Sequence, residues 1–433
     1  MKQFRYPSKS AEKRLAAIAR RGLGYRKKEQ SSVGRIIEDV RKNGDRALID
    51  YTRRYDCPDM TTASIRVTAE EIDAAPGQVD AAFRRALNRA CRQIEAFHKE
   101  QVNRSWIRTQ RPGTVLGQLV NPVDSAGIYV PGGKGGQTPL VSSLLMAAIP
   151  AKIAGVETLS VVTPPMPDGT VNPHVLAAAR KVGVHHIYKI GSAWAVAALA
   201  LGTETVQRVD VIVGPGNLFV TLAKKMLTGT VGIDIIAGPS EILVVADDSA
   251  RPAYVAADLL SQAEHDAVAS AVLVTPSPDL ARRVDEAVGH QLEDLDRREI
   301  AARSLEKYGA ILVVPDIDTA FTLANRIAPE HLELQIENPF DYIGRIRHAG
   351  AVFMGHFTPE PIGDYIAGPN HVLPTAGTAR FASALSVDHF TKKTSLIYYS
   401  RDAFRREAGD VVRLAQIEGL DAHAKSVKLR LSD

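Results

Sequence analysis

The stretch LLSQAEHD, residues 259–266, carries an amide and an imidazole three positions apart at the end of an apolar helical segment. Residues i and i+3 of a helix lie on one face, so Gln262 and His265 could bind one cation together. A second interpretation is a solvated helix end, where a histidine near the last carbonyls is favoured. The pair alone does not decide between these readings, and further ligands must come from elsewhere in the chain.

A carboxylate and an imidazole are adjacent in APEHLEL, residues 328–334. Glu330 and His331 would form a natural acid–base pair. Successive residues of a regular strand point to opposite faces, so joint action requires a turn or a helix start at this point. The alternative is an exposed glutamate beside a packed histidine.

Residues 355–380 are rich in glycine and proline and show no usable period. A loop of this length is usually functional or disordered, and its aromatic and aliphatic residues argue against disorder. It contains two candidate ligands, Asp364 and His371, although a capping role is the common one for an aspartate. The later stretch EGLDAH adds Glu418 and His423, which can serve one site only if Gly419 breaks the helix.

Two glycine-rich loops each follow a strand-like run and precede a helical one, VPGGKGGQTP at 130–139 and VGPGN at 213–217. Such loops leave backbone N–H groups free to meet a phosphate near a helix N-terminus. Either loop alone could be a tight turn. Two of them in one α/β block favour a dinucleotide or phosphate ligand.

The elements that must position these residues change character along the chain. From about residue 30 to 105, apolar residues recur every three or four positions, which is typical of helices. Strand-like runs then alternate with helical segments over residues 125–217 and again over residues 240–315. This alternation predicts parallel βαβ units in two sheet domains, and the cleft between such domains is the default ligand site.

The composition excludes several classes of protein. The 433 residues carry a net charge of only +4, which gives no reason to expect nucleic acid or an anionic membrane as partner. Two cysteines, Cys57 and Cys91, exclude a disulfide framework and fit a reducing cytosol. The opening MKQFRYPSKS has no apolar signal segment, and the apolar runs are too short to span a bilayer, so we expect a cytoplasmic protein.

Over about residues 25 to 430 the chain resembles histidinol dehydrogenases. The resemblance rests on AGPSEILVVAD, DLLSQAEHD, APEHLEL, TPEPIGDYIAGPNHVLPTAGTARF and EGLDAH, in this order, with GIYVPGG and VGPGN upstream. It implies an enzyme of histidine biosynthesis that depends on Zn2+ and NAD. Such an enzyme oxidises L-histidinol through L-histidinal to L-histidine with two NAD in succession, and it is an intertwined homodimer.

The resemblance also implies a fold and its boundaries. The fold would be α/β, with two incomplete Rossmann-like domains built on parallel sheets and small helical extensions used in dimerisation. The implied parts are an N-terminal helical arm at 1–24, a discontinuous first domain at 25–128 and 240–384 with the metal and catalytic residues, an NAD-binding second domain at 129–239, and a C-terminal helical dimerisation segment at 385–433.

Site residues follow from the matching motifs. The implied zinc ligands are Gln262, His265, Asp364 and His423, the last donated by the partner subunit. Glu330 and His331 match the catalytic acid–base pair. The implied substrate contacts are Ser240, Gln262, His265, Glu330, His331, Asp364, His371, Glu418 and His423. The implied NAD contacts are Tyr129, Asn217 and the position of Trp194.

Trp194, in GSAWAVAALALG, stands where the family usually has glutamine. An indole cannot accept a hydrogen bond as an amide can, but it can stack on a flat ring. One hypothesis therefore places Trp194 against NAD, with stacking in place of the lost amide contact. The other places it in the core, packed by an alanine-rich helix.

Three other functions compete with histidinol oxidation. A related zinc and NAD dehydrogenase could take another polyol, such as a sulfonated one, but this would need a cationic side chain where Glu418 and His371 suit an amine and an imidazole. A metallohydrolase would use zinc to activate water and would need no dinucleotide. A non-catalytic zinc-stabilised dimer would not need Glu330 and His331.

Overall fold

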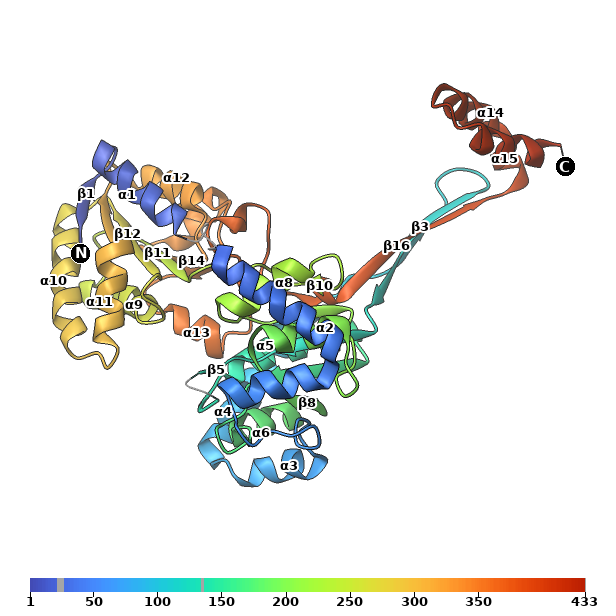
Figure 1. The fold of residues 1–433 in the computed structure, drawn as a ribbon. Coiled ribbons are helices and arrows are strands. Elements are labelled where there is room, and N and C mark those ends of the chain that lie inside the picture. Colours follow the sequence, from blue (N-terminus) through green and yellow to red (C-terminus); the bar gives the residue numbers. More distant parts are fainter. Residues whose placement is uncertain (22–26, 134–135, 433) are drawn as a thin grey trace. The chain divides into compact units, whose positions relative to one another are not determined.

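The computed structural model describes residues 1–21, 27–133 and 136–432 (Figure 1). The chain forms two compact units. The first comprises Met1–Gln101 with Asp124–Phe390, and the second Val102–Val123 with Thr391–Asp433. Among the described residues no helix is long and apolar enough to cross a membrane.

A six-stranded parallel sheet lies at the centre of one half of the first unit. Its strands, in spatial order β1-β13-β12-β11-β14-β15, are β1 (Gln3–Arg5), β13 (Ala310–Val313), β12 (Ser270–Thr275), β11 (Glu241–Ala246), β14 (His331–Gln335) and β15 (Ala351–Met354). Every residue of β11, β12 and β14 is buried, as expected for strands covered on both faces.

Alternate residues of β11 serve the two cores of this sheet. Ile242 and Val244 pack with α9 (Pro252–Ala263), α10 (Pro278–Glu293) and α11 (Arg298–Tyr308). Leu243 and Val245 pack with α1 (Lys9–Arg20) and α12 (Ile317–Ile327) on the other face. The continuous apolar run of the strand therefore reflects burial on two sides, not a single apolar face.

The second sheet has five parallel strands in the order β10-β9-β4-β7-β8. They are β10 (Gly232–Ile233), β9 (Val211–Val213), β4 (Ser125–Tyr129), β7 (Thr158–Thr163) and β8 (His186–Lys189). The helices between and around them are α5 (Val141–Ala154), α6 (Pro173–Lys181), α7 (Ser192–Leu201), α8 (Leu218–Leu227), α2 (Lys27–Tyr55), α3 (Ala69–Ala74) and α4 (Ala81–Lys99). Helix α2 packs against α7 and α8, and α4 packs against α5.

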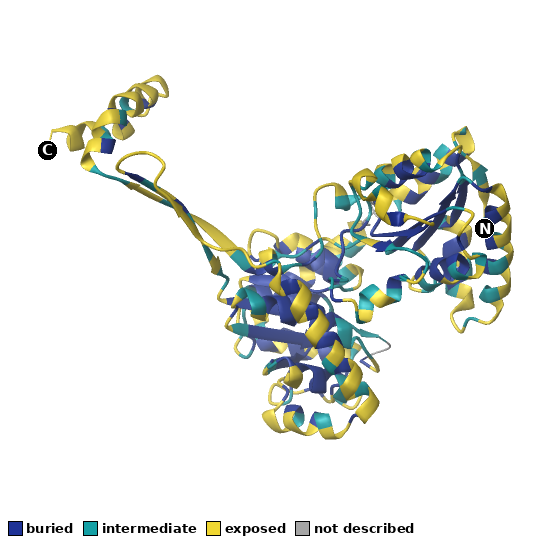
Figure 2. Cartoon of the chain, turned by 180° about the vertical axis from the view of Figure 1, so that it is seen from behind, coloured by how far each residue is buried: buried dark blue, intermediate teal, exposed yellow. Residues whose placement is uncertain are grey.

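The second unit is a β-ribbon followed by two helices. Strand β3 (Thr114–Pro122) pairs antiparallel with both β2 (Trp106–Arg108) and β16 (Thr391–Tyr399). Helices α14 (Arg401–Ile417) and α15 (Asp421–Leu431) follow, separated at Gly419 with φ +72°. The predicted break at Gly419 is confirmed. Figure 2 shows that this unit is mostly exposed, whereas the strands of both large sheets are buried.

Short elements complete the chain. They are the β5 (Gly132–Gly133) and β6 (Thr138–Pro139) pair, α13 (Glu360–Tyr365), and the 3₁₀ helices η1 (Ala75–Gly77), η2 (Pro339–Arg345), η3 (Thr378–Arg380) and η4 (Val387–Phe390).

The α/β class with two parallel sheets is confirmed, but the packing differs from the expected boundaries. The arm at 1–24 contributes a strand, β1, which extends the six-stranded sheet beside β13. Within 25–128, α2 and α4 pack on the five-stranded half, and β4 belongs to that sheet. The segment 385–433 contains strand β16 as well as helices. Apolar periodicity identifies a helix but not the surface that it covers, which explains the reassignment of α2.

Candidate active site

A cavity of about 830 Å³ is lined by residues from both halves of the first unit. The five-stranded sheet contributes segments that follow its strands, such as Pro131 after β4 and Pro215 after β9. The six-stranded sheet contributes segments that precede its strands, such as Ser240 before β11 and Glu330 before β14. The cavity therefore faces the carboxyl ends of one sheet and the amino ends of the other.

His331 is the first residue of β14 and lines this cavity. Its Nδ1 lies 3.0 Å from the carbonyl oxygen of Glu241 on the neighbouring strand. A carbonyl only accepts, so Nδ1 carries the proton and Nε2 keeps its lone pair. Burial lowers the pKa of His331 to about 4. The ring is therefore neutral near pH 7 and able to accept a proton at Nε2.

Glu330 lies just before β14, in a bend that follows Ala328 with φ +53°. The turn required for joint action with His331 is therefore present, and the Glu330 Oε2 lies 3.8 Å from His331 Nδ1. Oε2 also accepts a 2.9 Å hydrogen bond from the Glu241 N–H. Burial, and then the negative charges of Glu241 and Asp364, raise the pKa of Glu330 well above its usual range.

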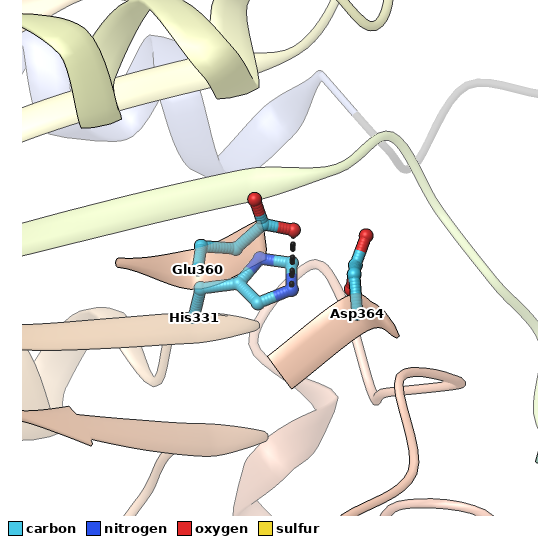
Figure 3. Close-up of side chains that lie close together, drawn as sticks. All are labelled: His331, Glu360 and Asp364. Carbon is cyan, nitrogen blue, oxygen red and sulfur yellow. Dashed lines mark ion pairs between the residues drawn. The ribbon is translucent and has the colours of Figure 1, made fainter. Parts of the chain in front are cut away.

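Helix α13 begins after Pro359 and carries Glu360 and Asp364 one turn apart. Their carboxylate oxygens and a ring nitrogen of His331 all lie within 4.8 Å of one another. Figure 3 shows the His331 ring facing the Glu360 carboxylate, with Nε2 3.8 Å from Oε1 and Asp364 beside them. Burial, and then Asp364, raise the pKa of Glu360 to about 9.

His371 joins this group from the long loop, with Nδ1 3.7 Å from Asp364 Oδ1. Burial lowers the pKa of His371. The long segment is thus ordered, as its apolar residues predicted, and both of its candidate ligands face the same cavity.

Gln262 lies near the end of α9 with 0% of its surface exposed. Neither its amide oxygen nor its amide nitrogen has a hydrogen-bond partner within the described part of the chain. A buried polar group left without a partner costs roughly 1–3 kcal/mol, so this amide fits a position that a ligand completes. His265, just past the helix end, lines the cavity. The oxygen and nitrogen ligands in this region are a set that suits zinc.

Glu418 and His423 belong to the second unit. Glu418 is the C-cap residue just after α14, His423 lies in the first turn of α15, and both are exposed.

Two buried carboxyl groups, those of Glu333 and Asp258, form a hydrogen-bond network next to the N-terminus of α13. Glu333, two residues after His331 on β14, accepts a 2.8 Å hydrogen bond from the Glu360 N–H through Oε1. Its carboxyl group is also hydrogen-bonded to that of Asp258 on α9, and Gln335 donates its amide to both. Burial, followed by Asp258, raises the pKa of Glu333 well above its usual range. Glu333 thus holds the N-terminus of the helix that carries Asp364.

The loop after β9 is a tight turn that leads into helix α8. Gly214 has φ +113°, and a side chain there would lie 2.3 Å from the Tyr129 carbonyl oxygen, so only glycine fits. Its N–H donates to Asp234 Oδ2 at 2.8 Å, and its carbonyl accepts from Lys224 at 3.0 Å. Asn217 caps α8 and lines the cavity. In the other glycine-rich loop, residues 134–135 lie outside the described residues.

Two expected cofactor contacts are buried instead. Trp194 is 4% exposed, its ring stacks on Tyr51 and Tyr55 at 5.5 and 5.7 Å, and its Nε1 donates to Thr52 at 3.3 Å. This packing is the one expected from the core interpretation of Trp194, because α2 supplies both the aromatic surface and the acceptor. Tyr129 is also buried, and its hydroxyl accepts from the Ser192 N–H at 3.0 Å.

Several site residues escaped the sequence analysis. Glu360 could have been found by its i, i+4 spacing from Asp364, but Arg21, Glu241 and Glu333 carry no local signal. Each becomes part of the site only through contacts with residues far away in the chain.

Comparison with known proteins gives a consistent result. Residues 20–431 match the histidinol dehydrogenase family. The chain is 56% identical over 402 residues to a histidinol dehydrogenase of Desulfotalea psychrophila, covering 93% of each protein. It is 54% identical to one of Syntrophotalea carbinolica, covering 97% of this chain and 96% of that protein. A crystal structure of histidinol dehydrogenase from Elizabethkingia anophelis matches with a TM-score of 0.93 and 37% identity, covering 100% of this chain and 98% of the other.

Proposed function

The chain belongs to the histidinol dehydrogenase family, and on this premise we propose that it oxidises L-histidinol through L-histidinal to L-histidine with two NAD in succession. The observation that carries the proposal is the buried pair of Glu330 and His331, held by one residue beside the carboxylates of α13. A neutral imidazole and a carboxyl group of raised pKa are the acid–base groups that such a reaction needs.

The proposed zinc ligands are Gln262, His265 and Asp364, with His423 of the partner subunit as the fourth. The buried Gln262 amide, which lacks partners among the described residues, supports this assignment. Zinc, when bound, would act as a Lewis acid that orients the substrate by coordinating nitrogen lone pairs of its imidazole and of its deprotonated amine.

The cavity wall suits a cationic substrate. Carboxyl groups of Glu264, Asp266 and Asp364 line it. Histidinol carries an amine that is protonated near pH 7 and an imidazole that titrates nearby, so it would be attracted to this wall. Ser240 and His371 line the same cavity and are proposed substrate contacts. Glu418, from the second unit, is proposed as a further contact.

In the first oxidation, His331 Nε2 accepts the hydroxyl proton of histidinol while a hydride leaves the carbon that bears this hydroxyl group and passes to NAD. The product is the aldehyde. In the second, Glu330 accepts a proton from water as the water oxygen adds to the aldehyde carbon. His331 returns its first proton to the aldehyde oxygen during this addition, and it then accepts a hydroxyl proton of the hydrate as the second hydride leaves for the second NAD. The two steps consume one water and remove four electrons.

The proposed NAD site is the loop Gly214–Asn217 with the N-terminus of α8, since backbone N–H groups and the helix dipole favour the pyrophosphate there. Of the predicted NAD contacts, Asn217 remains in this proposal.

The proposed enzyme is a homodimer intertwined through its C-terminal segment. Exposed apolar side chains on α14 and in the turn that follows it support a second copy as partner, namely Leu414, Ile417 and Leu420. Mixing His423→Ala with His265→Ala tests the shared site. A hybrid dimer would have one site with both lesions and one with neither, so activity should return on co-refolding. Mixtures that stay inactive would refute the cross-subunit ligand.

The direct test is to mix the purified protein with zinc, NAD and histidinol and follow NADH. Two NADH per histidinol, with loss of activity after chelation, is the expected result. NADH formed from a sulfonated propanediol but not from histidinol would instead identify the related polyol dehydrogenase.

A further inference from the structure

Arg21 follows α1 and carries a guanidinium that is buried at the edge of the cavity. Its side chain is 2% exposed and forms an ion pair with Glu241 at 3.2 Å, whose side chain is 5% exposed. The same guanidinium donates to the carbonyl oxygens of Ile18 at 2.8 Å and Val268 at 3.1 Å. A weaker 3.4 Å contact reaches the Ser240 carbonyl. The N-terminal arm is thus tied to the first residue of β11.

Glu241 forms hydrogen bonds with the side chains of both members of the catalytic pair. Its N–H donates to Glu330, and its carbonyl accepts from His331, at 2.9 and 3.0 Å. Its side chain accepts from the Ala376 N–H on the loop beyond His371 and pairs with Arg21. The peptide groups that aim the two catalytic side chains therefore belong to a residue whose own side chain is anchored by the arm.

We infer that Arg21 is a positioning residue for Glu330 and His331, so that the N-terminal arm is part of the catalytic apparatus. The inference rests on the catalytic roles proposed above. A buried charge that loses its partner is strongly unfavourable, so without Arg21 the Glu241 carboxylate must move or take up a proton. Either change would disturb the start of β11, where the two catalytic hydrogen bonds are made.

Arg21→Met removes the charge and the donors but keeps an apolar stem. Misplacing a catalytic group by about 1 Å can cost roughly 100-fold in rate, so we expect kcat to fall by about 10- to 100-fold. The KM values for NAD and histidinol should stay within about threefold, because Arg21 is proposed to contact neither ligand. Arg21→Lys keeps the charge and should recover part of the loss.

Arg14 offers a matched control on the same arm. Its guanidinium also donates to backbone carbonyls, at 3.0 Å to Gly309 and 2.9 Å to Glu306, but it does not line the cavity. Arg14→Met therefore weakens the docking of α1 as Arg21→Met does, without touching Glu241. It should leave kcat within about twofold of the parent.

A double-variant cycle separates the ion pair from the rest of the arm. Glu241→Gln alone leaves the Arg21 charge buried without its partner, whereas Glu241→Gln with Arg21→Met leaves neither charge. The combined variant should therefore lose less kcat than the product of the two single losses. If Arg21→Met proves too unstable to purify, Arg21→Gln takes its place in the cycle, because it also removes the charge.

A kcat for Arg21→Met within about twofold of the parent would overturn the inference, and so would an equal loss in Arg14→Met. His331→Asn is measured in parallel. If that variant keeps the parental rate, the proposed function itself fails. If it is slow while Arg21→Met is not, only the role of Arg21 fails.

Discussion

The contact between Glu333 and α13 predicts a sharp difference between two substitutions at one position. Glu333 and Asp258 are buried carboxyl groups in hydrogen-bond contact, and two such groups must share a proton. Glutamine has the shape of a protonated glutamate. In Glu333→Gln, its oxygen can accept from the Glu360 N–H and its amide can donate to Asp258, so both of these contacts are kept and only the 3.4 Å contact from Gln335 is lost.

Glu333→Leu instead removes the partner of two buried groups, the Glu360 N–H and the Asp258 carboxyl. Each such loss costs roughly 1–3 kcal/mol, so the variant should lose about 2–6 kcal/mol of unfolding free energy. Glu333→Gln should stay within about 1 kcal/mol of the parent, because the bonds to the Glu360 N–H and to Asp258 are retained.

Urea unfolding of both variants measures these free energies. Zinc content after dialysis gives a second readout, because α13 carries Asp364, and Glu333→Leu should retain less metal than Glu333→Gln. Equal destabilisation by the two substitutions would show that the pair does not share a proton, and the reasoning about this network would be refuted.

Three further predictions follow from the described contacts. Glu330→Gln should slow the oxidation of supplied histidinal more than that of histidinol, whereas His331→Asn should slow both oxidations by roughly 100- to 10,000-fold. Single-turnover NADH traces measure each step. Equal losses in both steps for Glu330→Gln would contradict the division of roles. Trp194→Phe loses the bond to Thr52 and part of the buried ring, so it should cost roughly 1–3 kcal/mol in urea unfolding and leave the KM for NAD unchanged. A raised KM at unchanged stability would contradict the core assignment. Burial raises the pKa of Asp56 from 3.8 to about 6, so the folded state binds this proton more tightly than the unfolded state does. The stabilisation that this proton gives is lost as pH rises through about 6. Asp56→Asn should therefore melt at a higher temperature than the parent near pH 8 but not near pH 4.

The positions of the strands could be predicted because buried parallel strands have unbroken runs of apolar residues in the sequence. ILVVA and AVLV are such runs, and they lie in the central strands β11 and β12. The partner of α2 was not predictable in the same way. Its apolar stripe fits any apolar surface, and its packing on α7 depends on contacts about 150 residues away in the chain.

Site residues could be predicted where they lie close together in the sequence, but not where distant segments of the chain bring them together. Glu330 and His331 are adjacent, and Asp364 and His371 share one loop, so the sequence brings them together. Arg21 meets Glu241 only because α1 packs on the six-stranded sheet.

The sequence also did not predict at which end of the six-stranded sheet the site lies. In open parallel sheets ligands usually bind at the carboxyl ends of the strands, yet here Ser240 and His331 lie at the amino ends of β11 and β14. The sequence places both residues beside strands, but it does not show that the opposite edge of the other sheet completes the cavity.

The pairing of β11 with β14 has a consequence for how damage to this protein would be detected. Ile242 lies opposite His331, and this alignment brings the Glu241 peptide groups within reach of both catalytic side chains. A slip by one residue would turn the buried side chains of the strand to the opposite face and move those groups away. A misaligned molecule could remain compact and helical while losing its catalysis. The turnover rate per folded molecule is therefore more sensitive to strand alignment in this sheet than any measure of secondary-structure content.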